Sequence, residues 1–198
     1  DEDIHTSTAK IVFEKDEISK EERNFAKTIN FGIVYGMEAY GLSQALGIDQ
    51  KKAKEFIEKY FEKFPMVKDY FETITKLLDE KGYVETFMHR RRYFEAWKYA
   101  GGPQKRALFR EAINMPTQGG TSDVIKIAMV ESFRKIRAEK LPVRLLLQVH
   151  DELVFEVLDK SKTKELEKTF ADIMDSAVDL GIPMKVSSKV GKDLSFVA

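Results

Sequence analysis

The sequence predicts an α+β fold, in which a helical part, residues 1–82, precedes a mixed part, residues 83–198. In the first part, apolar residues recur at helical spacing, and cap residues mark where each expected helix begins or ends. After Gly82, aromatic and β-branched residues, glycines and prolines indicate strands and turns. The stretches "VRLLLQV" and "ELVFEVL", joined by the short corner "HDE", further predict an antiparallel hairpin.

Cap residues set the expected helices of the first part. Ser19 and Glu22 fit a capping box at the start of a helix over 20–35, which Gly36 can stop. A short helix over "AYGLSQALGI" ends at Gly47, and Asp49 is a suitable N-cap for the helix that follows. Pro65 closes that helix, and "MVKDYFETITKLLDEKG" repeats the apolar pattern.

The second part is expected to alternate strands and helices. "YVETF" and "RRRYFEAW" favour strands, and a helix follows from Gln104 until Pro116 halts it. A separate helix is expected from an N-cap at Ser122. After the hairpin, a helix over 162–180 and a last strand, "MKVSSKV", complete the prediction.

Composition restricts the chemistry. The 198 residues are 43% hydrophobic and contain no cysteine, which excludes disulfides, thiolate zinc sites and a cysteine nucleophile. Lysine plus arginine and aspartate plus glutamate number 33 each, so any binding of phosphate depends on local groups. No apolar run is long enough to span a bilayer, and we expect a soluble, cytoplasmic protein without a membrane partner.

Four side chains at four-residue intervals form a stripe on the expected helix over 20–35. Arg23 and Lys27 suit phosphate oxygens near the positive end of the helix dipole, and Phe31 and Tyr35 suit a base. The stripe is about 18 Å long, which suits a nucleoside triphosphate. The alternative is a solvated cationic turn followed by core aromatics. On the nucleotide interpretation, the glycines at 32 and 36 leave room for a flat ring to approach the backbone.

The tip of the expected hairpin carries two carboxylates, Asp151 and Glu152. Hard cations such as Mg²⁺ take oxygen ligands and usually need more than one carboxylate plus substrate phosphate. Aspartate in a turn also serves purely local hydrogen bonding, so a structural role is the alternative.

Two further groups of polar side chains suit nucleic acid. Arg110, Asn114 and Gln118 form a second four-residue stripe, interrupted by Pro116, whose donors match the acceptors of the minor groove. The alternative is a polar solvent face. The run "RRR" at 90–92 attracts phosphates regardless of sequence.

These motifs together resemble the DNA polymerase I family (family A). "RNFAKTINFGIVYG" is similar to its fingers helix, in which Arg, Lys, Phe-Gly and Tyr-Gly recur at this spacing, and "QVHDELV" is similar to its palm motif. "REAINMPTQG" resembles the helix that binds template and primer, and "DIHTSTA" and "YVETFMHRRRYF" resemble further segments. His89 stands where the family more commonly has glycine. The resemblance extends over residues 3–195 and identifies 1–82 as a fingers portion and 83–198 as the rest of the fingers and the C-terminal palm.

The resemblance implies site residues for nucleotidyl transfer with two Mg²⁺ ions. It makes Asp151 a catalytic metal ligand with Glu152 in support, and Arg23 and Lys27 the residues that neutralise the triphosphate. Phe31 would stack on the incoming nucleotide, Tyr35 would guard the template base, and His5 would reach the triphosphate. The DNA contacts implied are those of Arg90, Arg91, Arg92, Arg110, Asn114, Gln118 and His150.

The resemblance also implies partners. Primer-template DNA and deoxynucleoside triphosphates are the expected substrates. The family's other catalytic aspartate belongs to an upstream palm motif that the 198 residues do not contain, so an upstream polymerase segment is a further expected partner. Without it, we expect weak activity or none. A non-catalytic nucleotide- or DNA-binding module of a split complex is the alternative, and a metal-dependent phosphodiesterase is a third.

Overall fold

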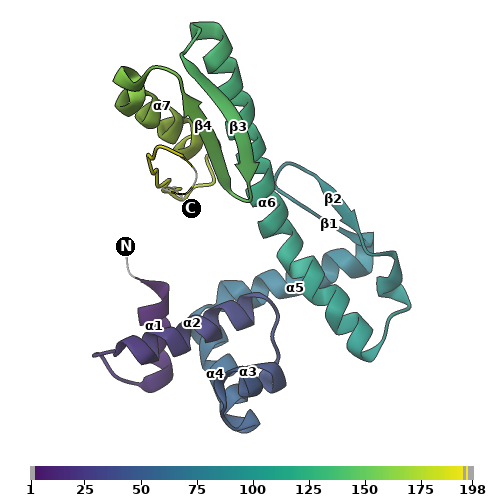
Figure 1. Cartoon of the computed structure of the whole chain (residues 1–198). Coiled ribbons are helices and arrows are strands. Elements are labelled where there is room, and N and C mark those ends of the chain that lie inside the picture. The colour runs from purple at the N-terminus through teal and green to yellow at the C-terminus, as the bar shows by residue number, and fades with distance from the viewer. Residues whose placement is uncertain (1–2, 194, 196–198) are drawn as a thin grey trace. The chain divides into compact units, whose positions relative to one another are not determined.

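The computed structural model describes residues 3–193 and 195 and divides into two compact units, 1–117 and 118–198 (Figure 1). The chain combines helices with two small antiparallel sheets, which confirms the α+β prediction. The first unit extends past residue 82 because the elements that follow share a core with the helix before them. No helix in the described part of the chain is long and apolar enough to cross a membrane.

Five helices form most of the first unit. The caps at Ser19, Gly36, Gly47 and Asp49 lie where the sequence predicts, and Ser19 and Glu22 form a complete capping box. Pro65 is the first residue of a new helix, a position at which its missing N–H costs nothing. The helices are α1 (Ile4–Phe13), α2 (Lys20–Val34), α3 (Ala39–Leu46), α4 (Gln50–Lys63) and α5 (Pro65–Lys81).

Two clusters of buried side chains stabilise this unit. The first holds α1, α2, α3 and α4 together around Ile29, Ile33 and Leu42. The second joins α5 to the strands β1 (Tyr83–Glu85) and β2 (Arg91–Tyr93), the short helix η1 (Glu95–Lys98) and the start of α6. Burial of these apolar surfaces fixes α2 on a rigid support.

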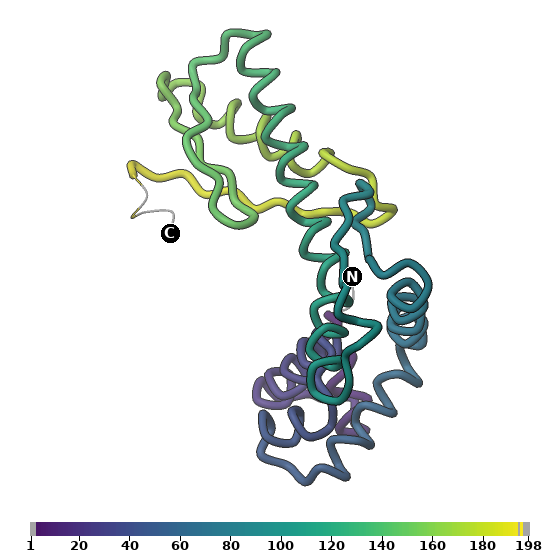
Figure 2. Tube along the Cα trace, turned by 90° about the vertical axis from the view of Figure 1, so that its right-hand side faces the viewer, coloured from purple at the N-terminus to yellow at the C-terminus, as the bar shows by residue number. Residues whose placement is uncertain are grey.

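Helix α6 (Gly102–Glu139) is continuous through Pro116 (Figure 2), so the prediction of two helices separated near Pro116 is wrong. Proline removes one backbone N–H, whose α-helical partner would be the carbonyl of residue 112. The next carbonyl, that of Ile113, accepts a hydrogen bond of 2.7 Å from the Tyr70 hydroxyl on α5. The disturbed turn therefore keeps a partner for one of its carbonyl groups.

Tyr70→Phe should lower the free energy of unfolding by about 0.5–1.5 kcal/mol, because it removes the hydrogen bond from the Tyr70 hydroxyl to the Ile113 carbonyl. Burial raises the pKa of Tyr70, which agrees with a hydroxyl enclosed between helices. Urea denaturation measures the change. Tyr99→Phe is the matched control, since Tyr99 is 89% exposed; equal losses in the two variants would contradict the assignment.

The second unit contains the predicted hairpin. Strands β3 (Val143–Val149) and β4 (Glu152–Val157) pair antiparallel with an irregularity between Leu145 and Leu147. The end of α6, the hairpin and α7 (Thr163–Asp175) share a small core, in which Phe155 and Phe170 stack 4.3 Å apart. The short helix η2 (Lys160–Lys162) leads into α7.

Two predictions for the C-terminal residues are wrong. Helix α7 ends at Asp175 instead of near 180, where Gly181 takes a positive φ and Pro183 follows. The expected strand "MKVSSKV" is not a strand in the described residues. Its backbone and side chains bond to α7 instead: Val186 N–H donates to the Asp175 carboxylate at 3.0 Å.

Candidate functional site

Three residues of the predicted stripe, Lys27, Phe31 and Tyr35, form an exposed strip of one cation and two aromatic rings. The rings of Phe31 and Tyr35 are nearly parallel, with centroids 6.2 Å apart, and each residue is close to half exposed. The Lys27 ammonium lies 5.9 Å from the Phe31 ring centroid. Exposed stacked aromatics beside a cation contradict the alternative in which they are core residues, and they offer a surface for a flat anionic ligand.

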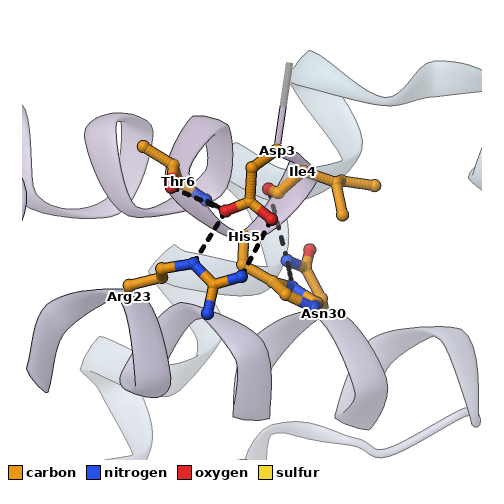
Figure 3. A network of polar contacts seen from close by, with 6 residues as sticks. All are labelled: Asp3, Ile4, His5, Thr6, Arg23 and Asn30. Atoms are coloured by element: carbon orange, nitrogen blue, oxygen red, sulfur yellow. Dashed lines mark hydrogen bonds and ion pairs between the residues drawn. The ribbon is translucent and has the colours of Figure 1, made fainter. Parts of the chain in front are cut away.

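Arg23, at the N-terminal end of this stripe, is paired with a carboxylate. Its Nε and a terminal nitrogen donate to the two oxygens of Asp3 at 2.9 and 3.0 Å, a bidentate arrangement (Figure 3). The same carboxylate caps α1 by accepting from the Thr6 N–H and hydroxyl. The Arg23 guanidinium holds the pKa of Asp3 far below its usual range. Asp3 is therefore ionised at neutral pH and orients Arg23.

His5 joins the stripe from α1. Its ring centroid is 5.6 Å from that of Phe31, and its Nδ1 lies 2.9 Å from the amide nitrogen of Asn30 on α2 (Figure 3). The structure therefore brings together five of the residues that the sequence singles out: His5, Arg23, Lys27, Phe31 and Tyr35.

The two glycines next to the stripe, Gly32 and Gly36, do not serve to make room for a ligand ring, as we predicted, but have other structural reasons. Gly32 is buried, and a Cβ there would lie 3.2 Å from the Met37 sulfur, so Met37 fills the space that we assigned to a ligand ring. Gly36 takes φ +74°, and a Cβ would lie 2.7 Å from Ile113 Cδ1 and 2.9 Å from Arg110 Cγ. The glycine at 36 thus permits both the turn and the close approach of α6.

Gly36→Ala should destabilise the chain by about 1–3 kcal/mol for the overlap with α6, in addition to about 1–2 kcal/mol for the left-handed backbone. Gly47→Ala is the matched control, because Gly47 has φ +64° but no atom within 4 Å of the added carbon. Chemical denaturation of both variants separates the two causes. The packing account fails if the two substitutions cost the same.

The second stripe lies on α6. Arg110 is exposed and Asn114 donates its amide to the Arg110 carbonyl at 2.8 Å, so that donor is engaged within the helix. Gln118, the first residue of the second unit, is exposed. Because α6 is continuous, the interruption expected at Pro116 does not occur.

The three consecutive arginines lie on the loop and second strand of the β1–β2 hairpin, and all are exposed. Arg91 donates to Glu85 at 3.0 Å and lies over the Tyr83 ring, while Arg92 pairs with Glu111 on α6. Successive strand residues point to opposite faces, so Arg91 and Arg92 do not share one face of the hairpin. His89, in the hairpin loop, has φ +59°, a conformation that favours glycine.

The acidic corner of the second unit is a two-residue turn. Val149 pairs with Glu152, so His150 and Asp151 form the tip of the hairpin. His150 has φ +53°, as mirror-image hairpin turns require, and the Gln148 amide donates to the His150 carbonyl at 2.8 Å. Asp151 and Glu152 are exposed. Among the described residues, no group of three or more potential ligands comes together to hold a metal ion, so this corner offers two carboxylates only.

Two residues of the site escaped the sequence interpretation. Asp3 pairs with Arg23, and Asn30 contacts His5 from within the stripe helix. The pattern Asp3-x-x-Thr6 is a cap signal that could have indicated α1 and placed Asp3 beside the stripe. Asn30, a polar residue between Ile29 and Ile33 on an apolar face, could have indicated a buried hydrogen-bonding role.

Comparisons with known proteins show the family to which this segment belongs. The chain belongs to DNA polymerase family A, whose family model matches residues 1–195. It is 45% identical over 193 residues to DNA polymerase I of Bacillus caldotenax, 46% to that of Bacillus subtilis, and 43% to the thermostable DNA polymerase I of Thermus filiformis. The solved POL domain of Pol1 from M. smegmatis, in complex with DNA primer-template and dNTP, is 38% identical with a TM-score of 0.86.

The chain matches only a part of these relatives. The alignments cover 96% of this chain but 22–23% of the three polymerases, and 94% of this chain but 33% of the solved domain.

Proposed function

We propose that this chain is the C-terminal part of a DNA-directed DNA polymerase, which binds a deoxynucleoside triphosphate and primer-template and contributes to two-metal nucleotidyl transfer. The exposed strip of Lys27, Phe31 and Tyr35, with Arg23 and His5 beside it, carries this proposal. The solved relative holds a dNTP and a primer-template, which supports the same substrates here.

The strip suits the two ends of a nucleotide. Arg23 and Lys27 neutralise triphosphate oxygens, Phe31 stacks on the incoming base or sugar, and Tyr35 guards the position of the template base. Lys27 gives its proton to the departing pyrophosphate, because an ammonium releases a proton more readily than a guanidinium.

Asp3 prepares Arg23 for this role. The bidentate pair holds the guanidinium in one orientation while no nucleotide is bound. A triphosphate carries more negative charge than a carboxylate and also accepts two parallel hydrogen bonds, so it competes with Asp3 for Arg23.

We propose that the carboxylates of the acidic corner, Asp151 and Glu152, form part of a magnesium site. Asp151, with Glu152 in support, would hold a Mg²⁺ ion at the tip of a paired hairpin. Two exposed neighbouring carboxylates fit a hard cation that keeps several waters and shares substrate phosphate. Bound magnesium would stabilise the charge on the reacting phosphate and activate the primer hydroxyl. Two carboxylates are too few to hold both ions, so the upstream segment supplies the other catalytic aspartate.

We assign the contacts with DNA to the remaining polar groups of the predicted site. The phosphate backbone is contacted by Arg90, Arg91 and Arg92. For this, a phosphate must replace Glu85 as the partner of Arg91 and Glu111 as the partner of Arg92. The end of the primer duplex is contacted in its minor groove, where base acceptors receive hydrogen bonds from Arg110, Asn114, Gln118 and His150.

Exposed apolar side chains on β3 of the second unit suit packing against the upstream segment. Leu146, Leu147 and Val149 on β3 are each about half exposed. Strands that leave such side chains uncovered usually pair or pack with a further element. We propose that the upstream palm segment covers them, which agrees with a chain that spans a fifth of its relatives.

A titration of the chain alone separates this function from its main alternative. A labelled deoxynucleoside triphosphate with magnesium should bind, and Lys27→Ala should weaken that binding. Primer-template should bind weakly, because the chain has no net charge. Tight binding of primer-template by the chain alone would favour the non-catalytic DNA-binding module instead. Failure to bind the nucleotide would contradict the assignment of the strip.

A further inference from the structure

A buried polar pair joins α1 to α2 behind the exposed strip. Thr8 is 1% exposed and Asn30 is 4% exposed, and the Thr8 hydroxyl donates to Asn30 Oδ1 at 2.9 Å. A buried amide is costly unless it is hydrogen-bonded, and apolar residues on either side of Asn30 complete the helix contact without it. The amide therefore calls for an explanation beyond packing.

The orientation of the Asn30 amide is fixed by its neighbours. Its Nδ2 lies 3.4 Å from the carbonyl oxygen of Ile4, and a carbonyl oxygen only accepts hydrogen bonds. The atom facing Ile4 must therefore be the NH₂ group. Thr8 agrees with this orientation, because its hydroxyl donates to the amide oxygen on the other side.

This orientation determines the state of the His5 ring. The same NH₂ group lies 2.9 Å from His5 Nδ1 (Figure 3), so Nδ1 must accept and cannot carry a proton. In a neutral imidazole one nitrogen donates and the other accepts, and the partner of one sets the state of the other. The proton of His5 therefore resides on Nε2.

We propose that Asn30 is a positioning residue that fixes His5 as the Nε2–H tautomer and so keeps a neutral N–H donor beside the strip for a triphosphate oxygen. The contact with the triphosphate rests on the proposed function; the tautomer does not. The opposite tautomer would present a lone pair from Nε2 to an anion and repel it. Phe31 lies beside the His5 ring, and Asp3, two residues before His5, holds Arg23, so the donor belongs to the same cluster of residues as the proposed nucleotide strip.

Nitrogen-15 NMR of the histidine rings in the whole chain tests the tautomer directly. The chain has three histidines, so His5→Gln assigns the His5 signals by their loss. With the ring neutral, we expect an unprotonated Nδ1 and a protonated Nε2. A protonated Nδ1 in the neutral ring would overturn the proposal, and this result needs no variant at Asn30.

Asn30→Asp tests the cause. It replaces the NH₂ group by a carboxylate oxygen of similar shape, so Nδ1 should become protonated and its signal should move accordingly. Asn24→Asp makes the same change at an exposed position on α2 and should leave the His5 signals in place. Circular dichroism confirms that both variants are folded. An unchanged Nδ1 signal in folded Asn30→Asp would overturn the role of Asn30.

A titration with deoxynucleoside triphosphate and magnesium separates this proposal from the proposed function. Movement of the His5 Nε2 signal, with Nδ1 still unprotonated, supports both. Binding of the nucleotide without any change at Nε2 would overturn the contact between His5 and the triphosphate. The tautomer is decided by the measurement on the free chain, so the two failures are distinguishable.

Discussion

Asp151→Asn should lower primer extension by roughly 10³-fold or more in a mixture of this chain with the upstream palm and thumb segments, a loss of about 4 kcal/mol in transition-state stabilisation. The substitution keeps the size of the side chain but removes the negative charge that a hard cation requires. The hairpin should remain folded, because Asp151 is an exposed turn residue. Single-turnover extension of a labelled primer measures the effect.

Two neighbouring substitutions show whether the loss is specific. Glu152→Gln should cost less, about 10–100-fold, as expected of a group that supports a ligand. Glu156→Gln, on the same strand and paired with Arg144, should leave extension unchanged. If Asp151→Asn retained activity within tenfold of the unchanged chain, Asp151 could not be a metal ligand of the reaction.

Lys27→Ala should lower the rate of the chemical step by about 10²–10⁴-fold, the usual contribution of a positioned proton donor. The affinity for the nucleotide should also fall, because the substitution removes a positive charge from the strip. Rapid-quench extension over a range of nucleotide concentrations separates the rate from the affinity.

Lys20→Ala is the control for charge. Lys20 is exposed at the first turn of the same helix, so the substitution removes an equal charge away from the aromatic strip. It should leave the chemical step unchanged. A loss of affinity in Lys27→Ala without any loss of rate would limit Lys27 to binding and contradict its role as proton donor.

Local signals in the sequence predicted much of this fold. The capping box at Ser19, the left-handed glycines and the N-cap at Asp49 act within a few residues, so short patterns contain them. The hairpin was predictable for the same reason, since two apolar strands flank a two-residue turn.

The failures depended on contacts between distant residues. Proline at 116 predicts a break, but α5 supplies the Tyr70 hydroxyl to the disturbed turn from 43 residues away. Gly32 appeared suited to a ligand because the sequence does not reveal that Met37 folds back over it. The last predicted strand bonds to α7 instead of a strand. In each case a tertiary contact outweighs a local preference.

The candidate site divides in the same way. The stripe of Arg23, Lys27, Phe31 and Tyr35 followed from helical spacing alone, and its exposed, stacked geometry agrees with that prediction. Asp3 and His5 reach it from the N-cap and the first turn of α1, and Asn30 on α2 lies 2.9 Å from the His5 ring.

Primer extension with magnesium and four deoxynucleotides tests the central claim most directly. The chain alone is compared with the chain mixed with a polypeptide that carries the upstream palm and thumb segments. We expect extension in the mixture and little or none with either part alone, which would show that the upstream segment supplies groups that these 198 residues need for activity. Vigorous extension by the chain alone would mean that a carboxylate within these 198 residues completes the metal site, and would contradict the account.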